Sequence, residues 1–237
     1  MAKRVVSETA RRRRRPTKQG QVLSHRLIVE TALRMLREHG AAGLTVRRLG
    51  HALGADASTV YRYFRGMDDL ILAIADELFG HAMQGWRASG DWHADLRRLG
   101  LRIHNAYLAH PQAAVLTASR VTGRPNEVAT DEAILGVLRG AGFPDADAVR
   151  IYHAFVDQAL AFAILDAATL ALPPAAREAD EEVWQETYAR LPAATHPHIA
   201  ATAPLLVAHM NDSAYPTALD MLLSSAAGHL GNLPPAA

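Results

Sequence analysis

The fold of this chain of 237 residues is decided by one stretch, LTVRRLGHALGADASTVYRYF, which runs from residue 44 to residue 64. Its apolar residues recur at the spacing of two short amphipathic helices, and Gly54 separates the two. Thr45 precedes the first helix and Asp56 precedes the second, and both residue types cap helix N-termini. The stretch therefore predicts a helix-turn-helix whose second helix buries Val60 and Phe64.

Small, hydroxylated and basic side chains remain on the outer face of the second helix. Ala57 and Ser58 permit a close approach, while Thr59 and Arg62 offer hydrogen bonds to bases or phosphates. The first helix opens with Arg47–Arg48, although cations in a first turn oppose the helix dipole. An approaching phosphate gives a reason for them, because a helix N-terminus binds anions. The pattern is typical of a helix that enters a DNA major groove.

The charge of the chain is divided unevenly along its length. Residues 1–67 carry 15 Lys and Arg against 4 Asp and Glu, whereas residues 68–237 carry 10 against 20. Arg11–Arg15 form an uninterrupted basic run. The division predicts a head that binds a polyanion and a body that nucleic acid repels. A nucleic-acid-binding protein without a regulatory role stays open as an alternative, but its basic charge should spread over the whole chain.

Composition excludes several classes of protein. The chain contains no cysteine, so disulfides and thiolate metal sites are excluded, and a reducing cytoplasm is the expected location. We expect no membrane span, because no run of 18 apolar residues occurs, and no signal peptide. A small helical enzyme is a second alternative, but the sequence has no GxSxG elbow, P-loop or GxGxxG fingerprint. The twelve histidines form no HExxH motif, so neither a metal nor a cofactor is expected.

Helical periodicity predicts an all-α chain in three parts. These are a disordered basic arm (1–23), a helix-turn-helix domain (24–70) and a ligand-binding and dimerisation domain (71–237). A fourth helix, which Asp68 and Asp69 open, crosses the second boundary, so a continuous helix joins head and body. Ser24 should cap the first helix and Gly40 should end it. Further helices are expected at 93–109, 112–120, 127–141, 145–171, 178–190 and 215–230, with an irregular connector and a short helix at 191–210.

Residues 24–79 resemble the DNA-binding domain of the TetR family of bacterial transcriptional repressors. The resemblance rests on Leu44-Thr45 after Gly40, on Arg47-Arg48-Leu49, on Leu53-Gly54 and on TVYRYF at 59–64. It implies a homodimer that binds a pseudo-palindromic operator and leaves it when the body binds a small-molecule inducer. The residues expected at the DNA are Thr45, Arg47, Arg48, Ala57, Ser58, Thr59, Tyr61, Arg62 and Tyr63. Met67 stands where the family usually has Lys, and Arg65 is the expected replacement.

The body resembles, more weakly, the tetracycline-repressor subgroup of that family. The matching stretches are Gly90-Asp91-Trp92, Leu108-Ala109-His110-Pro111 and Gly142-Phe143. The resemblance places His110 at a magnesium-coordinating histidine and Asp166 near a carboxylate that binds the hydrated metal. Leu99 replaces an asparagine that holds the drug, so the tetracycline site is not reproduced. The residues expected to line the effector site are His104, His110, Phe155, Phe162 and Asp166, and an aromatic or polycyclic inducer is expected there.

The body is also expected to form the contact between two subunits. The two helices at 145–171 and 215–230 should pair with their copies in a second subunit as a four-helix bundle. The apolar residues expected to form its core are Ala159, Phe162, Leu165, Leu219, Leu222 and Leu223.

Overall fold

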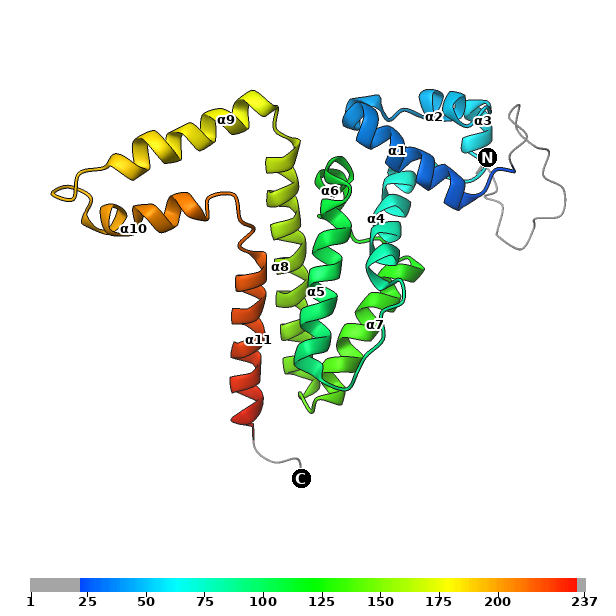
Figure 1. Ribbon diagram of the computed structural model, residues 1–237. Helices are drawn as coiled ribbons and strands as arrows, with labels where there is room; N and C mark the ends of the chain where they lie inside the picture. Colours follow the sequence, from blue (N-terminus) through cyan, green and yellow to red (C-terminus); the bar gives the residue numbers. More distant parts are fainter. Residues whose placement is uncertain (1–21, 234–237) are drawn as a thin grey trace.

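The computed structural model describes residues 22–233, and within that range the regular elements are all helical (Figure 1). The all-α prediction is confirmed. The elements are α1 (His25–Gly43), α2 (Val46–Ala52), α3 (Ala57–Val60), α4 (Met67–Met83), α5 (Trp92–Leu108), α6 (Pro111–Thr117), α7 (Pro125–Gly140), α8 (Asp145–Ala171), α9 (Pro174–Glu182), α10 (Pro197–Ala208) and α11 (Tyr215–Gly231). A π turn (Val183–Thr187) and a 3₁₀ turn (Tyr188–Arg190) continue α9.

Helix α1 begins where the sequence predicts but ends later. Ser24 caps it by accepting a hydrogen bond from the backbone N–H of Leu27 at 3.1 Å. Gly40 has φ +65°, so it interrupts the helical path as expected, and a further turn runs on to Gly43. Thr45 caps α2 by accepting from the N–H of Arg48 at 3.2 Å. Asp56 occupies the cap position of α3 but its side chain makes no capping hydrogen bond.

The turn between α2 and α3 depends on two glycines. Gly54 has φ +62°, the left-handed region that a side chain disfavours. A Cβ atom on Gly50 would lie 2.9 Å from the carbonyl oxygen of Ala55, so the turn packs directly on the backbone of α2. Any larger residue at Gly50 would push the two helices apart and change the angle at which α3 is presented.

The folded head begins before residue 24. Leu23, which the sequence placed in the arm, is buried with 6% of its surface exposed. The hydroxyl of Tyr63 donates a hydrogen bond to the carbonyl oxygen of Leu23 at 2.9 Å. The ring of His25 packs edge-on against Tyr63 and Phe64. The start of α1 is therefore fastened to the end of the helix-turn-helix. Residues 1–21 of the predicted arm, which include Arg11–Arg15, lie outside the described residues.

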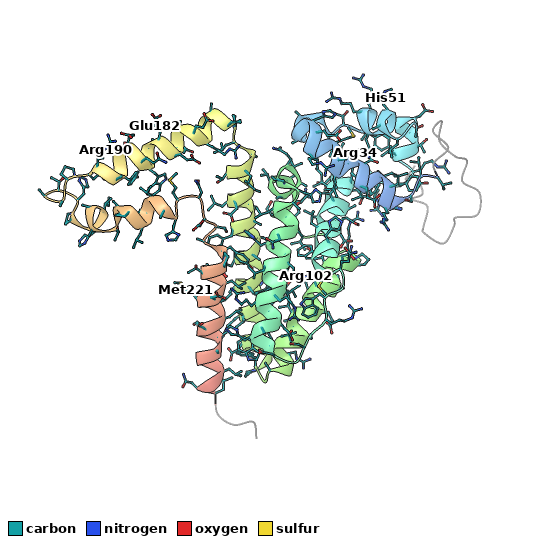
Figure 2. The ribbon with its side chains drawn as sticks, viewed as in Figure 1. Arg34, His51, Arg102, Glu182, Arg190 and Met221 are labelled. Carbon is teal, nitrogen blue, oxygen red and sulfur yellow. The ribbon has the colours of Figure 1, made fainter. Side chains whose placement is uncertain are left out.

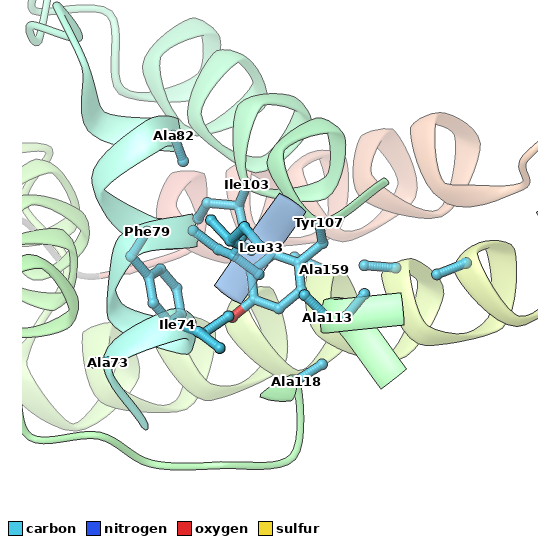
Figure 3. Packing of buried hydrophobic residues seen from close by; sticks show 14 of the residues in the cluster. Leu33, Ala73, Ile74, Phe79, Ala82, Ile103, Tyr107, Ala113, Ala118 and Ala159 are labelled. Carbon is cyan, nitrogen blue, oxygen red and sulfur yellow. The ribbon is translucent and has the colours of Figure 1, made fainter. Parts of the chain in front are cut away.

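Head and body share one hydrophobic core. Leu33 of α1 lies beside Ile74 and Phe79 of α4, Tyr107 of α5 and Ala113 of α6 (Figure 3). All five side chains are buried, and Phe79 meets Tyr107 edge-on at 5.9 Å between ring centroids. Helix α4 runs unbroken across the predicted boundary at residue 70. The head is consequently held against the body by packing as well as by a continuous helix.

In the body, α8 and α11 lie side by side against α5 (Figure 1). A Cβ atom on Gly100 of α5 would lie 2.6 Å from the hydroxyl oxygen of Tyr215, which shows how closely α11 approaches. Ala159, Leu219 and Leu223 are fully buried within the chain, so the assignment of these three to a dimer interface is wrong. Their apolar stripe packs on α5 of the same chain. The large apolar side chains of these helices that are exposed are instead Val149, Leu165 and Leu170 of α8 and Met221 of α11, with Leu165 at 61% and Met221 at 68%.

A hairpin arm made of α9 and α10 projects from the ends of α8 and α11, on the side away from the head (Figure 1). The short helix expected within 191–210 is present as α10, a regular helix of 12 residues that contains Pro204, so the irregular part of this segment is shorter than expected. The arm presents apolar residues to solvent, among them Val183, at 47%, and Leu205, at 64%. It therefore offers surface that its own chain does not cover.

Helix α8 is apolar well beyond the part of it that is buried. An 18-residue window within it has a mean hydropathy of 1.5, and 22% of that window is buried inside the chain. By length and composition alone it could cross a bilayer, although core helices of soluble proteins pass the same test. Asp157 and Asp166 interrupt the apolar run, which is why no uninterrupted stretch is visible in the sequence.

Candidate DNA interface and effector site

The outer face of α2 and α3 presents the side chains that the sequence predicts for DNA contact. Arg47, Ser58 and Arg62 are exposed, and Tyr61 has 42% of its surface exposed. Thr45 accepts the capping hydrogen bond through its oxygen, so its hydroxyl proton remains available to a phosphate. Ala57, Thr59 and Arg48 complete this set, half-buried for the first two and exposed for the third.

Tyr63 is placed differently from the other predicted contacts. It is half-buried, and its hydroxyl donates to Leu23 rather than pointing freely into solvent. A phenol has one proton to donate, so this bond engages it in the structure. The sequence contained no signal for the contact, because its partner lies 40 residues away.

A basic groove between α1 and α2 adjoins this face, and the sequence reasoning missed it. Its volume is about 450 Å³, and its walls include Arg34 and Glu38 from α1 and Arg47, Arg48 and His51 from α2. Arg34 and His51 lie on the head, on different helices, in Figure 2. Residues three and four apart along each helix share the groove, so helical periodicity was the signal that could have found it.

Four of the five predicted effector residues gather around Tyr215. His104 Nε2 lies 2.8 Å from Asp166 Oδ2, and the His104 ring stacks on Tyr215 with 4.6 Å between centroids. The ring of Phe162 lies 5.8 Å from that of Tyr215. Phe155 is fully buried, close to Gly100 and the same tyrosine, so it belongs to the packed core. The cluster joins α5, α8 and α11.

Two buried polar atoms near this cluster have no hydrogen-bond partner among the described residues. They are the hydroxyl of Tyr215 and the side-chain oxygen of Gln158. The amide nitrogen of Gln158 donates to the carbonyl of Ala218, on the turn of α11 that follows Tyr215. Burial raises the pKa of the Tyr215 hydroxyl, so it stays protonated and can donate. An unpaired buried donor and an unpaired buried acceptor are unusual in a folded protein, and a bound water molecule or a polar ligand would pair them.

Asp166 also fixes the base of the hairpin arm made of α9 and α10. Its Oδ2 accepts from Ser213 Oγ at 2.5 Å as well as lying beside His104. Asp166 stands near the end of α8, before the arm, and Ser213 follows α10, after it. The carboxylate thus binds both ends of the arm to α5. The sequence had assigned Asp166 to the effector itself.

His110 does not join the other four. It lies at the N-terminus of α6, and its ring centroid is 5.8 Å from that of His81 on α4. Burial lowers the pKa of His110, and the neighbouring His81 and Arg37 lower it further. Its Nδ1 is buried without a partner among the described residues. Within residues 22–233, no group of three His, Asp or Glu side chains is placed to hold a metal ion.

The lowered pKa of His110 predicts a loss of stability in acid. The folded protein binds its proton less readily than the unfolded chain, so stability falls as the pH drops from about 6.5 through the folded value. The slope from this one residue is at most about 1.4 kcal/mol per pH unit. We expect His110→Gln to reduce the fall in the free energy of unfolding, measured by urea denaturation, between pH 7.5 and pH 5.5. His153→Gln, at an exposed position, is the control, and an unchanged acid loss in His110→Gln contradicts the prediction.

A series of contacts joins α4 to residues 120–127, which lead from the end of α6 into the first turn of α7. Asp68 pairs with Arg120 at 2.8 Å, and Asp69 pairs with Arg124 at 2.5 Å. Asp76 accepts hydrogen bonds from the backbone N–H groups of residues 126 and 127, each at 2.9 Å. Burial raises the pKa of Asp76 against the effect of these bonds. The sequence identified Asp68 and Asp69 only as the start of a helix, because their partners lie some fifty residues away.

Two family models match this architecture. The model described as "Bacterial regulatory proteins, tetR family" matches residues 28–74, and "Tetracyclin repressor-like, C-terminal domain" matches residues 86–225. The chain belongs to the TetR family. The resemblance seen in the sequence is therefore confirmed, both for the head and for the tetracycline-repressor-like body. Members of this family are transcriptional regulators rather than enzymes.

Individual relatives agree with this assignment. A transcriptional regulator of Saccharopolyspora erythraea is 30% identical over 56% of this chain and 58% of its own length. The class A tetracycline repressor from transposon 1721 of Escherichia coli is 33% identical over 52% and 57%. The chain thus spans less than two thirds of these curated relatives. A crystal structure of a possible TetR family transcriptional regulator from Streptomyces coelicolor A3(2) matches 87% of this chain and all of its own, with 31% identity and a TM-score of 0.72.

Proposed function

We propose that this TetR-family regulator is a cytoplasmic repressor that binds a pseudo-palindromic operator as a homodimer and is released by a small-molecule inducer. The observation that carries the proposal is the exposed outer face of α2 and α3, which presents Arg47, Ser58 and Arg62 on a basic head. An acidic body holds that head through α4, so DNA is attracted to one end of the molecule only.

The roles at the DNA follow from side-chain chemistry. Arg47 and Arg62 carry guanidinium groups that can bond guanine in the major groove, and Ala57 and Ser58 permit the close approach. Thr45, Arg48, Thr59 and Tyr61 are assigned to phosphates and sugars, which position the helix without reading sequence. Tyr63 acts indirectly, by holding the start of α1 through Leu23. Two such heads would enter successive major grooves about 34–36 Å apart.

Dimerisation is assigned to the outer faces of α8 and α11. Leu165 and Met221 lie exposed there, and Figure 2 shows Met221 on the side of α11 that faces away from α5. Exposed large apolar residues on long helices are typical of an interface. A second copy would cover the part of α8 that its own chain leaves bare. The four helices would then form a bundle of two α8 and two α11.

The effector is assigned to the cluster around Tyr215. Its recognition would use the unpaired Tyr215 hydroxyl as a donor and the Gln158 side-chain oxygen as an acceptor. Aromatic rings of Tyr215 and Phe162 favour an aromatic or polycyclic compound. One structural neighbour, ActR from Streptomyces coelicolor, was crystallised with actinorhodin and has a TM-score of 0.77. A displacement of α8 or α11 by the effector would be transmitted to α4 through α5, because α5 packs on all three helices.

The test begins with operator selection. The purified full chain is incubated with a random duplex library, and bound DNA is sequenced over several rounds. We expect an inverted repeat to emerge, and the dimer to bind it about 10³-fold or more tightly than scrambled DNA. Compounds are then screened for release of the labelled operator, with an expected loss of affinity of about 5- to 150-fold. Equal affinity for all sequences would contradict the proposal.

A further inference from the structure

We propose that the groove between α1 and α2 binds a phosphate of the operator backbone, so that the DNA contact extends beyond the helix-turn-helix onto α1. The inference rests on the proposed function, since it assumes that the head binds DNA. It adds Arg34 and His51 to the contact surface, neither of which belongs to α3 or to the N-terminus of α2. The groove, of about 450 Å³, has space for a phosphate group and the adjoining sugar.

The charge of the groove favours an anion. Three guanidinium groups, two imidazoles and one carboxylate line it. The carboxylate, Glu38, lies 4.0 Å from the ring of His39 and makes no closer ion pair among the described residues. A surplus of unpaired positive charge is unfavourable in the free protein because like charges repel. It becomes favourable when a phosphate enters, and displacement of counterions from DNA adds to the gain.

The arginines of the groove are free to make that contact. Within residues 22–233, Arg34 and Arg47 take part in no ion pair or side-chain hydrogen bond, and Arg48 makes a single long bond of 3.5 Å to the carbonyl of Gly43. The cations that face α4 behave differently, since Arg120 and Arg124 are both paired with carboxylates. The guanidinium group of Arg34, which has no other assigned role, is therefore available to a partner from outside the chain.

Continuity with the proposed DNA face selects the occupant. Arg47 lines the groove and also stands in the first turn of α2, beside the capping residue Thr45. A DNA strand that places one phosphate at the start of α2 would continue past His51, which lies one turn further along that helix. Arg34 on α1 faces it from the other side of the groove. Base edges are read by α3, so contact in this groove would be independent of sequence.

The test compares Arg34→Ala with the unaltered chain on the selected operator and on a scrambled duplex. Loss of one phosphate contact should lower both affinities by about fivefold at 0.15 M salt and reduce the slope of log K against log salt by about 0.9. Arg34→Lys should restore the slope, because it keeps the charge. Arg37→Ala removes an exposed cation of the same helix that does not line the groove, and it should leave the slope unchanged.

Several results would overturn the inference while leaving the proposed function intact. An unchanged slope in Arg34→Ala would show that no phosphate lies in the groove. A loss on the operator alone would make Arg34 a reader of sequence. Saturable binding of inorganic phosphate without DNA, abolished by Arg34→Ala, would reassign the groove to a free anion. If the unaltered chain bound neither duplex, the proposed function itself would fail. Thermal unfolding of each variant checks that the head stays folded.

Discussion

Arg62→Ala is expected to lower affinity for the operator by about 5- to 150-fold, which corresponds to the 1–3 kcal/mol of a bidentate contact between arginine and guanine. Arg62 is exposed and lies in the turn that follows α3, one residue beyond its C-cap Tyr61, where a guanidinium can reach a base edge. Affinity for scrambled DNA should fall much less, because only the phosphate contribution is shared. Fluorescence anisotropy with labelled operator and scrambled duplexes measures both values.

The matched control is Arg65→Ala, three residues further on. Arg65 is also exposed, and we assign it to the phosphate contact that Met67 cannot make. Its loss should weaken binding to both duplexes by the same factor. If Arg62→Ala behaved in the same way as Arg65→Ala, Arg62 would be a phosphate contact and the reading of sequence would have to lie elsewhere on α3.

Leu165→Asp is expected to convert the dimer into a monomer. A two-fold interface would bury two copies of the new carboxylate, and an unpaired buried charge costs about 3–5 kcal/mol. Leu165 has 61% of its surface exposed in the single chain, so the substitution leaves the fold of the monomer intact. Met221→Asp on α11 should act in the same way. Size-exclusion chromatography with light scattering measures the mass of each variant in solution. The affinity for the operator should fall in any variant that becomes monomeric.

Val121→Asp provides the control for this experiment. It introduces the same charge at a residue with 86% of its surface exposed, between α6 and α7 and away from the proposed interface. We expect that variant to remain dimeric. A dimer of unchanged stability for both Leu165→Asp and Met221→Asp would place the interface elsewhere, and the arm of α9 and α10 would then be the next surface to alter.

Local features of the fold were predicted well from the sequence. Ser24 and Thr45 cap the helices that they were expected to cap, and the helix at 145–171 has the bounds that the sequence gives it. Capping and the breaks at glycine and proline depend on neighbours within a few residues, so they are visible in the sequence. The short helix expected within 191–210 is longer than its prolines suggest, because α10 accommodates Pro204 within a regular helix.

Contacts between distant residues were predicted less well. An apolar stripe shows that a helix face is buried, but it does not show what covers it. Leu219 and Leu223 were therefore assigned to a second subunit although they pack on α5. His104 and His110 were assigned to one site, yet the first faces Tyr215 and the second lies beside His81. The pairing of Asp69 with Arg124 likewise could not be inferred from either residue alone.

The contacts of α4 determine where the DNA-binding head of a relative could be joined to this body. The carboxylates at 68, 69 and 76 all bind the segment from 120 to 127, so α4 belongs structurally to the body. A chimera that took a foreign head should therefore be joined at Gly66, before α4 begins, and not inside the helix. The foreign α1 would still need a residue that fills the place of Leu33 against Tyr107. Operator choice and effector response could then be recombined as separate modules.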